Sequence, residues 1–209
     1  MRDDFLVFGS PQIHDDEIAE VVDSLKSGWL GTGPKVKRFE NLFSSYNNSK
    51  YAIAVNSCTA ALHLSLKALD LNEGDEVITT PMTFCSTVNT IIHAGATPVL
   101  ADIDPITMNI DPKKIEEKIT KKTKCILPVH FAGRSCEMNE IVQIAKKHEL
   151  YIIEDCAHAI ETIYDGKKAG TFGDFGCFSF YVTKNLVTGE GGMVITNHEE
   201  SANRIKRLG

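Results

Sequence analysis

The sequence lacks the features that mark membrane, secreted and nucleic-acid-binding proteins. No apolar run approaches the ~20 residues that a membrane-spanning helix needs, and residues 1–4 lack the basic and then apolar layout of a signal peptide. The net charge is -6, and the basic cluster at 113–124 is interrupted by Glu116 and Glu117, as on a solvated helix face. We therefore expect a cytoplasmic protein that binds neither membranes nor nucleic acid.

The cysteines form no Cys-x-x-Cys pair. They are scattered along the chain, at positions 58, 85, 125, 136, 156 and 177. Several stand inside apolar runs, where a cysteine acts as a small hydrophobic residue. The spacing therefore predicts neither a disulfide framework nor a metal site.

Short apolar segments alternate with amphipathic segments along most of the chain. The apolar segments predict strands at 51–55, 76–79, 98–103, 125–129, 151–154, 175–180 and 192–196. Apolar residues at helical spacing predict helices at 15–27, 59–69, 84–94, 112–119, 137–148 and 198–208. Strands that alternate with helices are typical of an α/β fold with a mostly parallel sheet. The length of 209 residues suffices for one domain, 1–209.

Polar residues follow two of the predicted strands, where ligands bind in open α/β sheets. The turn at 56–60 offers the hydroxyls of Ser57 and Thr59 and free backbone amides, which suit a phosphate group. Ser57 is equally suited to be a plain helix cap. Asp155 can pair with a buried cationic group or cap the next segment. His158, three residues on, can join the same cleft or serve a structural role.

Lys184 follows Ser179 by five residues and precedes three glycines, at 189, 191 and 192. An isolated lysine is usually a solvent-exposed charge. Here the lysine lies between two apolar strands, among glycines that permit close backbone approach. A desolvated amine in such a place holds its proton less tightly and becomes a nucleophile toward an aldehyde.

The phosphate-binding turn, the strand-end Asp155 and Lys184 together fit pyridoxal phosphate. This cofactor needs an anion site, a partner for its pyridinium nitrogen and a lysine that attaches it as a Schiff base. The combination predicts a pyridoxal-phosphate enzyme, although each element alone has a structural explanation.

Several sequence motifs resemble those of the DegT/DnrJ/EryC1/StrS family of nucleotide-sugar aminotransferases. They are GWLGTGP at 28–34, NSCTAAL at 56–62, PMTF at 81–84, GATPV at 95–99, PVHFAG at 128–133, EDCAHA at 154–159 and SFYVTKNLVTGEGG at 179–192. The motifs run nearly from end to end of the chain in the family's order. The resemblance implies a three-layer α/β/α fold, the large domain of the aspartate-aminotransferase architecture (fold type I).

The resemblance also implies catalytic roles. Lys184 would attach the cofactor and then carry the proton between the substrate carbon and the cofactor. Asp155 would pair with the pyridine nitrogen and keep it protonated. Phe84 occupies the position of the aromatic side chain that stacks on the ring.

The remaining candidate residues match positions around the cofactor in this family. Cys58, Thr59 and Ser179 correspond to phosphate contacts, the first two largely through backbone amides, with Ser57 in the same turn. His158 matches a residue beside the ring, near its 3′-oxygen.

The implied reaction moves an amine from glutamate to the keto group of a nucleotide-linked deoxysugar, in the biosynthesis of surface polysaccharide or glycoconjugate sugars. The motif at 28–34 and His158 most resemble members that act at the sugar's C4 position, such as the UDP-4-amino-4-deoxy-arabinose aminotransferase. The resemblance also implies a homodimer, and we expect the family's small C-terminal domain to be absent from this chain.

Two alternatives remain open. Some relatives are dehydratases, but they carry histidine at the lysine position, so Lys184 argues against this activity. Because we expect the small domain and its substrate groups to be absent, the chain is also compatible with a silent paralogue that acts as a cofactor-binding or regulatory subunit.

Overall fold

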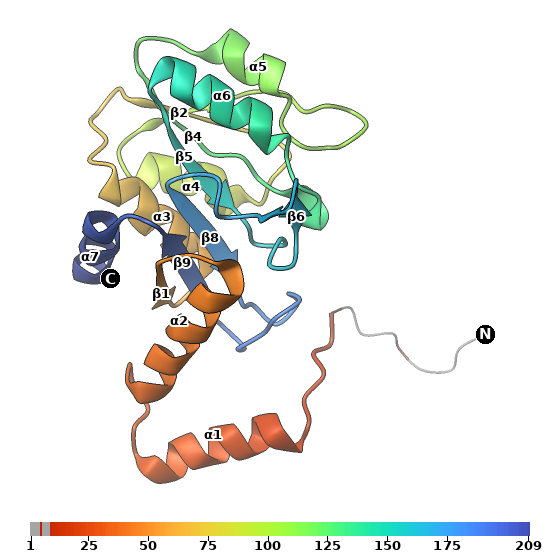
Figure 1. The fold of residues 1–209 in the computed structure, drawn as a ribbon, viewed down its shortest axis with the longest axis vertical. Coiled ribbons are helices and arrows are strands. Elements are labelled where there is room, and N and C mark those ends of the chain that lie inside the picture. The colour runs from red at the N-terminus through yellow and green to blue at the C-terminus, as the bar shows by residue number, and fades with distance from the viewer. Residues whose placement is uncertain (1–4, 6–8) are drawn as a thin grey trace.

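The computed structural model describes residue 5 and residues 9–209 (Figure 1). Residues 1–4, on which the expectation of no signal peptide rests, lie outside the described residues. Among the helices of the described part, none combines the length and the apolar character that crossing a membrane requires.

A seven-stranded sheet forms the centre of the fold, in the order β1-β9-β8-β5-β4-β2-β3. Its strands are β1 (Tyr51–Val55), β2 (Glu76–Thr79), β3 (Thr97–Leu100), β4 (Thr123–Ile126), β5 (Tyr151–Asp155), β8 (Phe175–Ser179) and β9 (Gly192–Thr196). Neighbouring strands are parallel except for β9, which runs antiparallel to both β1 and β8. The carboxyl ends of β1, β5 and β8 therefore meet at one edge of the sheet.

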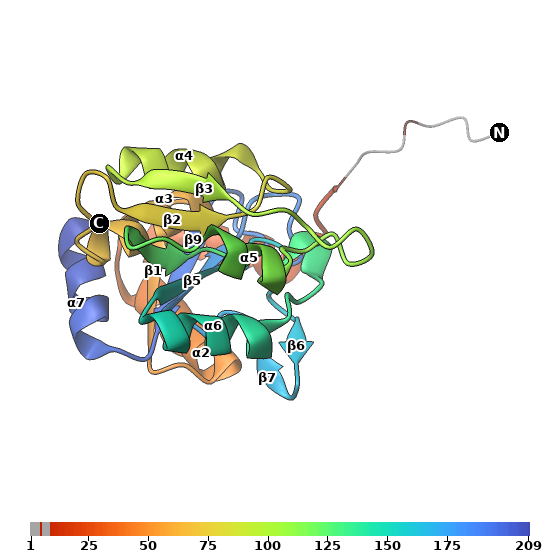
Figure 2. The same cartoon turned by 90° about the horizontal axis from the view of Figure 1, so that it is seen from above.

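Helices cover both faces of the sheet, so the fold has three layers (Figure 2). One face is covered by α3 (Cys58–Ala68), α4 (Cys85–His93) and α7 (Glu199–Leu208), which share one core with the strands. The other face is covered by α2 (Pro34–Asn47), α5 (Pro112–Lys118) and α6 (Met138–His148), over two further cores. The predicted α/β/α architecture with a mostly parallel sheet is confirmed.

Successive residues of β5 alternate between the two faces, as side chains on a strand must. Ile153 belongs to the core beneath α3 and α4, whereas Ile152 belongs to the core beneath α6. The same alternation places Asp155 on the first face and Glu154 on the second. The carboxylates of these two adjacent residues at the end of β5 therefore point to opposite faces of the sheet.

Helix α1 (Asp15–Ser27) contributes no buried residue and extends away from the three layers (Figure 1). Its bounds match the prediction, and Gly28 ends it in the left-handed conformation. The apolar face that predicted the helix, which includes Val21 and Leu25, is exposed on this chain. The apolar periodicity predicted the helix correctly, but the apolar face of this helix does not pack on the core.

The sequence did not predict α2, the short hairpin of β6 (Ile163–Tyr164) and β7 (Lys167–Lys168), or the single turn η1 (Phe131–Gly133). Strands β3 and β4 are shorter than predicted because both pair with β2, which has only four residues. The other predicted elements agree with the observed ones to within one or two residues.

Most cysteines pack as the small hydrophobic residues that the sequence indicated. Cys85 is exposed, and the others are buried, at positions 58, 125, 136, 156 and 177. Burial raises the pKa of the Cys156 thiol to about 12, which keeps this group protonated at neutral pH.

The layering predicts unequal costs for the same substitution in α3 and α1. Leu62 is 0% exposed and Leu25 is 61% exposed. Leu62→Ala should lower the free energy of unfolding by about 2–5 kcal/mol, because it removes packing and leaves a cavity. Leu25→Ala should change it by less than about 0.5 kcal/mol. Urea denaturation measures both, and equal costs would contradict the described packing.

Candidate active site

A cavity of about 580 Å³ opens at the edge where β1, β5 and β8 end. All the site residues predicted from the sequence line it: Ser57, Cys58, Thr59, Phe84, Asp155, His158, Ser179 and Lys184. They come from distant parts of the chain, and the parallel strands bring them to one edge.

The turn before α3 forms one wall of the cavity. Ser57 caps the helix, because its Oγ accepts a hydrogen bond from the amide of Ala60 at 3.1 Å. The amides of Cys58 and Thr59 are the first two of the helix and have no intrahelical acceptor. Together with the positive end of the helix dipole, they form a site suited to an anion. Ser57 is therefore both the cap and a part of this wall.

Gly192 allows this turn to approach the strands closely. A Cβ atom at this position would lie 2.4 Å from the carbonyl carbon of Ser57. Gly192 also pairs with Val55 of β1 and with Ser179 of β8. The glycine that opens β9 thus places the Ser179 side chain near the turn at the start of α3.

Asp155 is buried at the end of β5, and its two oxygens each accept one hydrogen bond. The Thr87 hydroxyl donates to Oδ2 at 2.9 Å, and the Ala157 amide donates to Oδ1 at 3.1 Å. Burial raises the pKa of Asp155, while the bonds from Ala157 and Thr87 oppose the rise. A carboxylate offers about four acceptor sites, so Asp155 retains capacity for a cationic donor.

Lys184 lies after β8, in a connection that is folded back on itself. The Thr188 amide donates to the Phe180 carbonyl at 2.9 Å, and the Phe180 amide donates to the Gly191 carbonyl at 2.9 Å. The Nζ of Lys184 lies 2.6 Å from the Nε2 of His158. Burial and the neighbouring Lys184 lower the pKa of His158, so neutral His158 accepts a hydrogen bond from the amine.

The surroundings of these groups are more open than the sequence suggested. We expected a desolvated lysine, but Lys184 is only half-buried because the cavity opens to solvent beside it. Phe84 borders the cavity yet is 76% exposed. None of the described residues, 5 and 9–209, covers that side of the ring.

Sequence reasoning missed Thr87, the buried donor to Asp155, and Thr83, whose hydroxyl lies 2.7 Å from that of Thr87. The available signal was the position of Thr87 on the buried face of α4 beside Thr90 and Ile91. A hydroxyl in such a place needs a partner. The sequence does not indicate which partner, because Asp155 is 68 residues away.

Residues 11–209 match the DegT/DnrJ/EryC1/StrS aminotransferase family. The chain is 55% identical to the spore coat polysaccharide biosynthesis protein SpsC of Bacillus subtilis over 207 residues. These aligned residues are 99% of this chain and 53% of SpsC. The Streptococcus pneumoniae protein Spr1654, solved in its PLP form, superposes with a TM-score of 0.93 at 38% identity, over 97% of this chain and 57% of that one. Helicobacter pylori PseC, an aminotransferase involved in the biosynthesis of pseudoaminic acid, superposes with a TM-score of 0.92 at 34% identity, over 96% of this chain and 54% of PseC.

The fold is thus that of the fold type I aminotransferases, as the sequence predicted. The chain belongs to the DegT/DnrJ/EryC1/StrS aminotransferase family, whose members depend on pyridoxal phosphate. It spans about half the length of the relatives that it matches.

The contact between Lys184 and His158 predicts a change in titration. In the cofactor-free chain, Lys184→Met should raise the pKa of His158, because it removes a positive charge that disfavours protonation of the imidazole. Histidine C–H resonances followed by NMR against pH measure this pKa. Lys124→Met, on the exposed side of β4, is the matched control and should leave it unchanged. A His158 midpoint that is the same in both variants would rule out the contact.

Proposed function

We propose that this chain is the cofactor-binding part of a pyridoxal-phosphate-dependent aminotransferase that acts on a nucleotide-linked keto sugar. The observation that carries the proposal is the position of Asp155. A buried carboxylate with spare acceptor capacity faces the cavity that also holds Lys184 and an anion-binding helix start. Burial of a charge with incomplete pairing is costly, so such a group fits a site that receives a cation.

The residues present fit the cofactor at its three polar positions. The amides of Cys58 and Thr59 and the hydroxyl of Ser179 would hold the phosphate. Asp155 would pair with the protonated pyridine nitrogen, and Lys184 would attach to the aldehyde carbon. Gly192 keeps the phosphate turn and β8 close enough to serve one ligand.

When bound, pyridoxal phosphate supplies an aldehyde that accepts amines and a ring that withdraws electrons from the adjacent carbon. Asp155 would keep a proton on the ring nitrogen, because a buried anion favours the charged form of its partner. The amine of Lys184 would give and take the proton at the substrate carbon. Neutral His158 accepts a hydrogen bond from the Lys184 amine and so orients it.

The substrate class rests on the family and on the relatives. SpsC is a polysaccharide biosynthesis protein, and PseC is an aminotransferase of pseudoaminic acid biosynthesis. We propose glutamate as the amine donor and C4 of a nucleotide-linked keto-deoxysugar as the acceptor, from the motif at 28–34 and His158. The open side of the cavity at Phe84 fits a homodimer in which a second subunit and a small domain complete the site.

The proposal predicts a visible absorption band when the purified chain is incubated with pyridoxal phosphate. Lys184→Ala should lack the protein-bound band, because no other lysine is among the described residues that line the cavity. Lys124→Ala is the matched control and should keep the band. Added glutamate should shift the band to shorter wavelength as the cofactor takes up the amine.

Each outcome of this titration has a separate meaning. A chain that remains colourless, or a Lys184→Ala variant that keeps the band, would contradict the proposed cofactor site. A band that persists in glutamate would support the alternative of a silent, cofactor-binding subunit.

A further inference from the structure

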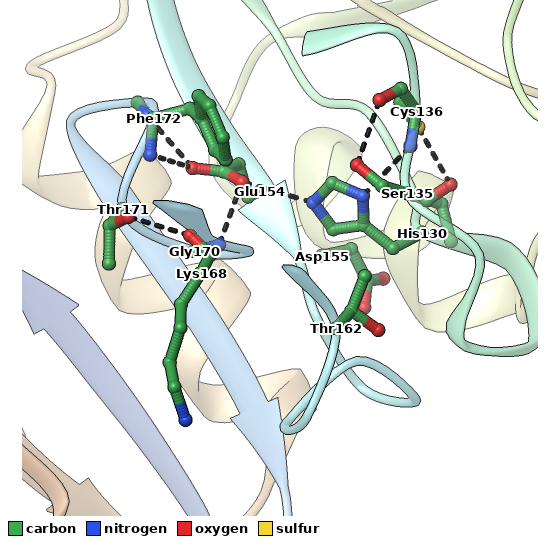
Figure 3. A network of polar contacts seen from close by, with 12 residues as sticks. His130, Ser135, Cys136, Glu154, Asp155, Thr162, Lys168, Gly170, Thr171 and Phe172 are labelled. Carbon is green, nitrogen blue, oxygen red and sulfur yellow. Dashed lines mark hydrogen bonds and ion pairs between the residues drawn. The ribbon is translucent and has the colours of Figure 1, made fainter. Parts of the chain in front are cut away.

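A second buried polar cluster lies next to the proposed site and has no role in the reaction described above. It is centred on Glu154 and His130, which point toward each other (Figure 3). Both side chains are 0% exposed. Ionisable side chains are rarely buried so completely unless their hydrogen bonds are satisfied. The hydrogen bonds of Glu154 and His130 therefore identify the segments of the chain that this pair connects.

Glu154 accepts four hydrogen bonds. The amides of Phe172 and Gly173 donate to Oε1 at 2.7 and 2.8 Å, and the amide of Gly170 donates to Oε2 at 2.7 Å. Oε2 lies 3.0 Å from the Nε2 of His130. All of the roughly four acceptor sites of a carboxylate are thus used. Asp155, by contrast, accepts only one bond at each oxygen.

The two nitrogens of His130 connect different parts of the chain. Nδ1 accepts a hydrogen bond from the Cys136 amide at 3.1 Å, and Nε2 donates to Glu154. Burial lowers the pKa of His130 and the Glu154 carboxylate raises it, whereas the Cys156 thiol, protonated at neutral pH, adds no charge. A second proton on the ring would nevertheless place an Nδ1–H against the Cys136 N–H. The geometry therefore assigns the neutral ring with its proton on Nε2.

A metal ion is the competing explanation, because His130, Glu154 and Cys156 bring their ligand atoms within 4.8 Å of one another. Ligation would require Glu154 to release backbone amides that it already accepts. It would also require the proton to leave Nε2, and burial raises the pKa of the Cys156 thiol that would have to lose its proton. The hydrogen-bonded arrangement leaves no free lone pair on Glu154 for an ion.

The network is joined to the backbone on both sides of Asp155. The Asp155 amide donates to the Pro128 carbonyl at 2.9 Å, and the His130 amide donates to the Asp155 carbonyl at 3.1 Å. The His130 ring fixes the same segment to the Glu154 side chain. The end of β5, and the direction of the Asp155 carboxylate, are therefore held from the opposite face of the sheet.

The network also reaches His158 and β8. The bond between His130 and the Cys136 amide closes the loop 131–136. Within this loop, the Gly133 carbonyl accepts a hydrogen bond from the Thr162 hydroxyl at 2.6 Å. Gly133 also lies against the backbone carbonyl of His158. The segment 170–173, held by Glu154, is packed so closely on β8 that a Cβ at Gly176 would lie 2.4 Å from the Gly170 carbonyl oxygen. That strand carries Ser179 at its end.

We propose that Glu154 and His130 form a positioning unit that fixes Asp155 and His158 from behind the sheet. The proposal rests on the proposed function for its consequence, which is the affinity for pyridoxal phosphate. The hydrogen-bond network itself does not depend on the proposed function, and it can be tested in the cofactor-free chain.

Two variants separate the two bonds of His130. His130→Gln places a side-chain amide near the Nε2 position and can still donate to Glu154, but it removes the acceptor for Cys136. His130→Asn places an acceptor near the Nδ1 position for Cys136 and removes the donor to Glu154. Both remove the ring, so the comparison between them sets the loss of the bond to Glu154 against the loss of the bond to Cys136.

Amide hydrogen exchange of the cofactor-free variants is the first measurement. In His130→Asn we expect faster exchange at Ala157, Gly170 and Phe172, with the amides of β1 and β2 unchanged. In His130→Gln these three amides should keep the protection of the parent chain. Protection lost evenly over the whole sheet in both variants, or unchanged at Ala157 in both, would overturn the proposal.

The second measurement is the dissociation constant for pyridoxal phosphate, read from the visible band. We expect it to rise on the order of tenfold in His130→Asn, as for other residues that orient a ligand indirectly, and to rise less in His130→Gln. Equal affinities in the two variants would contradict the proposal. A parent chain that takes up no cofactor would instead contradict the proposed function, and hydrogen exchange would still decide on the positioning unit.

A third measurement needs no variant, and so stays decisive should His130→Asn fail to fold. Imidazole 15N chemical shifts of the parent chain report the tautomer of each histidine. A protonated Nε2 and an unprotonated Nδ1 at His130 are expected. A protonated Nδ1 would overturn the assignment of the Cys136 contact, and with it the network.

Discussion

The burial of two adjacent carboxylates at the end of β5 constrains the rest of the site. Each buried charge needs hydrogen-bond donors, and the alternation of the strand sends Glu154 and Asp155 to opposite faces. Glu154 is satisfied by the protein itself, through three backbone amides and His130. Asp155 is satisfied only in part, by Thr87 and Ala157. The first is therefore a structural anchor, and the second remains available to a ligand.

The topology of the sheet explains why the other groups gather around Asp155. Because β1, β5 and β8 are parallel, the residues that follow them lie along one edge. The antiparallel β9 begins at this edge with Gly192, between the Ser57 turn and Ser179. A larger residue at Gly192 would push apart the two elements that we propose to hold the phosphate. The connection from β8 to β9 then brings the amine of Lys184 into contact with the ring of His158.

The sequence predicted the layers and the main site residues because each of these leaves a local signal. Ser57, Asp155 and Lys184 all stand at the ends of periodic segments, and the family motifs contain the remaining candidates. The partners Thr87, Glu154 and His130 were not predicted as such, since their contacts join residues far apart in the chain. The exposure of α1 was not predicted either, because periodicity shows that a helix has an apolar face but not what covers that face.

The central claim is that the cavity at the end of β5 holds pyridoxal phosphate on Lys184. Its most direct test is chemical: incubation of the chain with the cofactor, reduction with borohydride, and peptide mapping by mass spectrometry. The account predicts one stable pyridoxyl label, on the peptide that contains Lys184, and its loss in Asp155→Asn at limiting cofactor. A label spread over surface lysines with Lys184 unmodified would contradict the account.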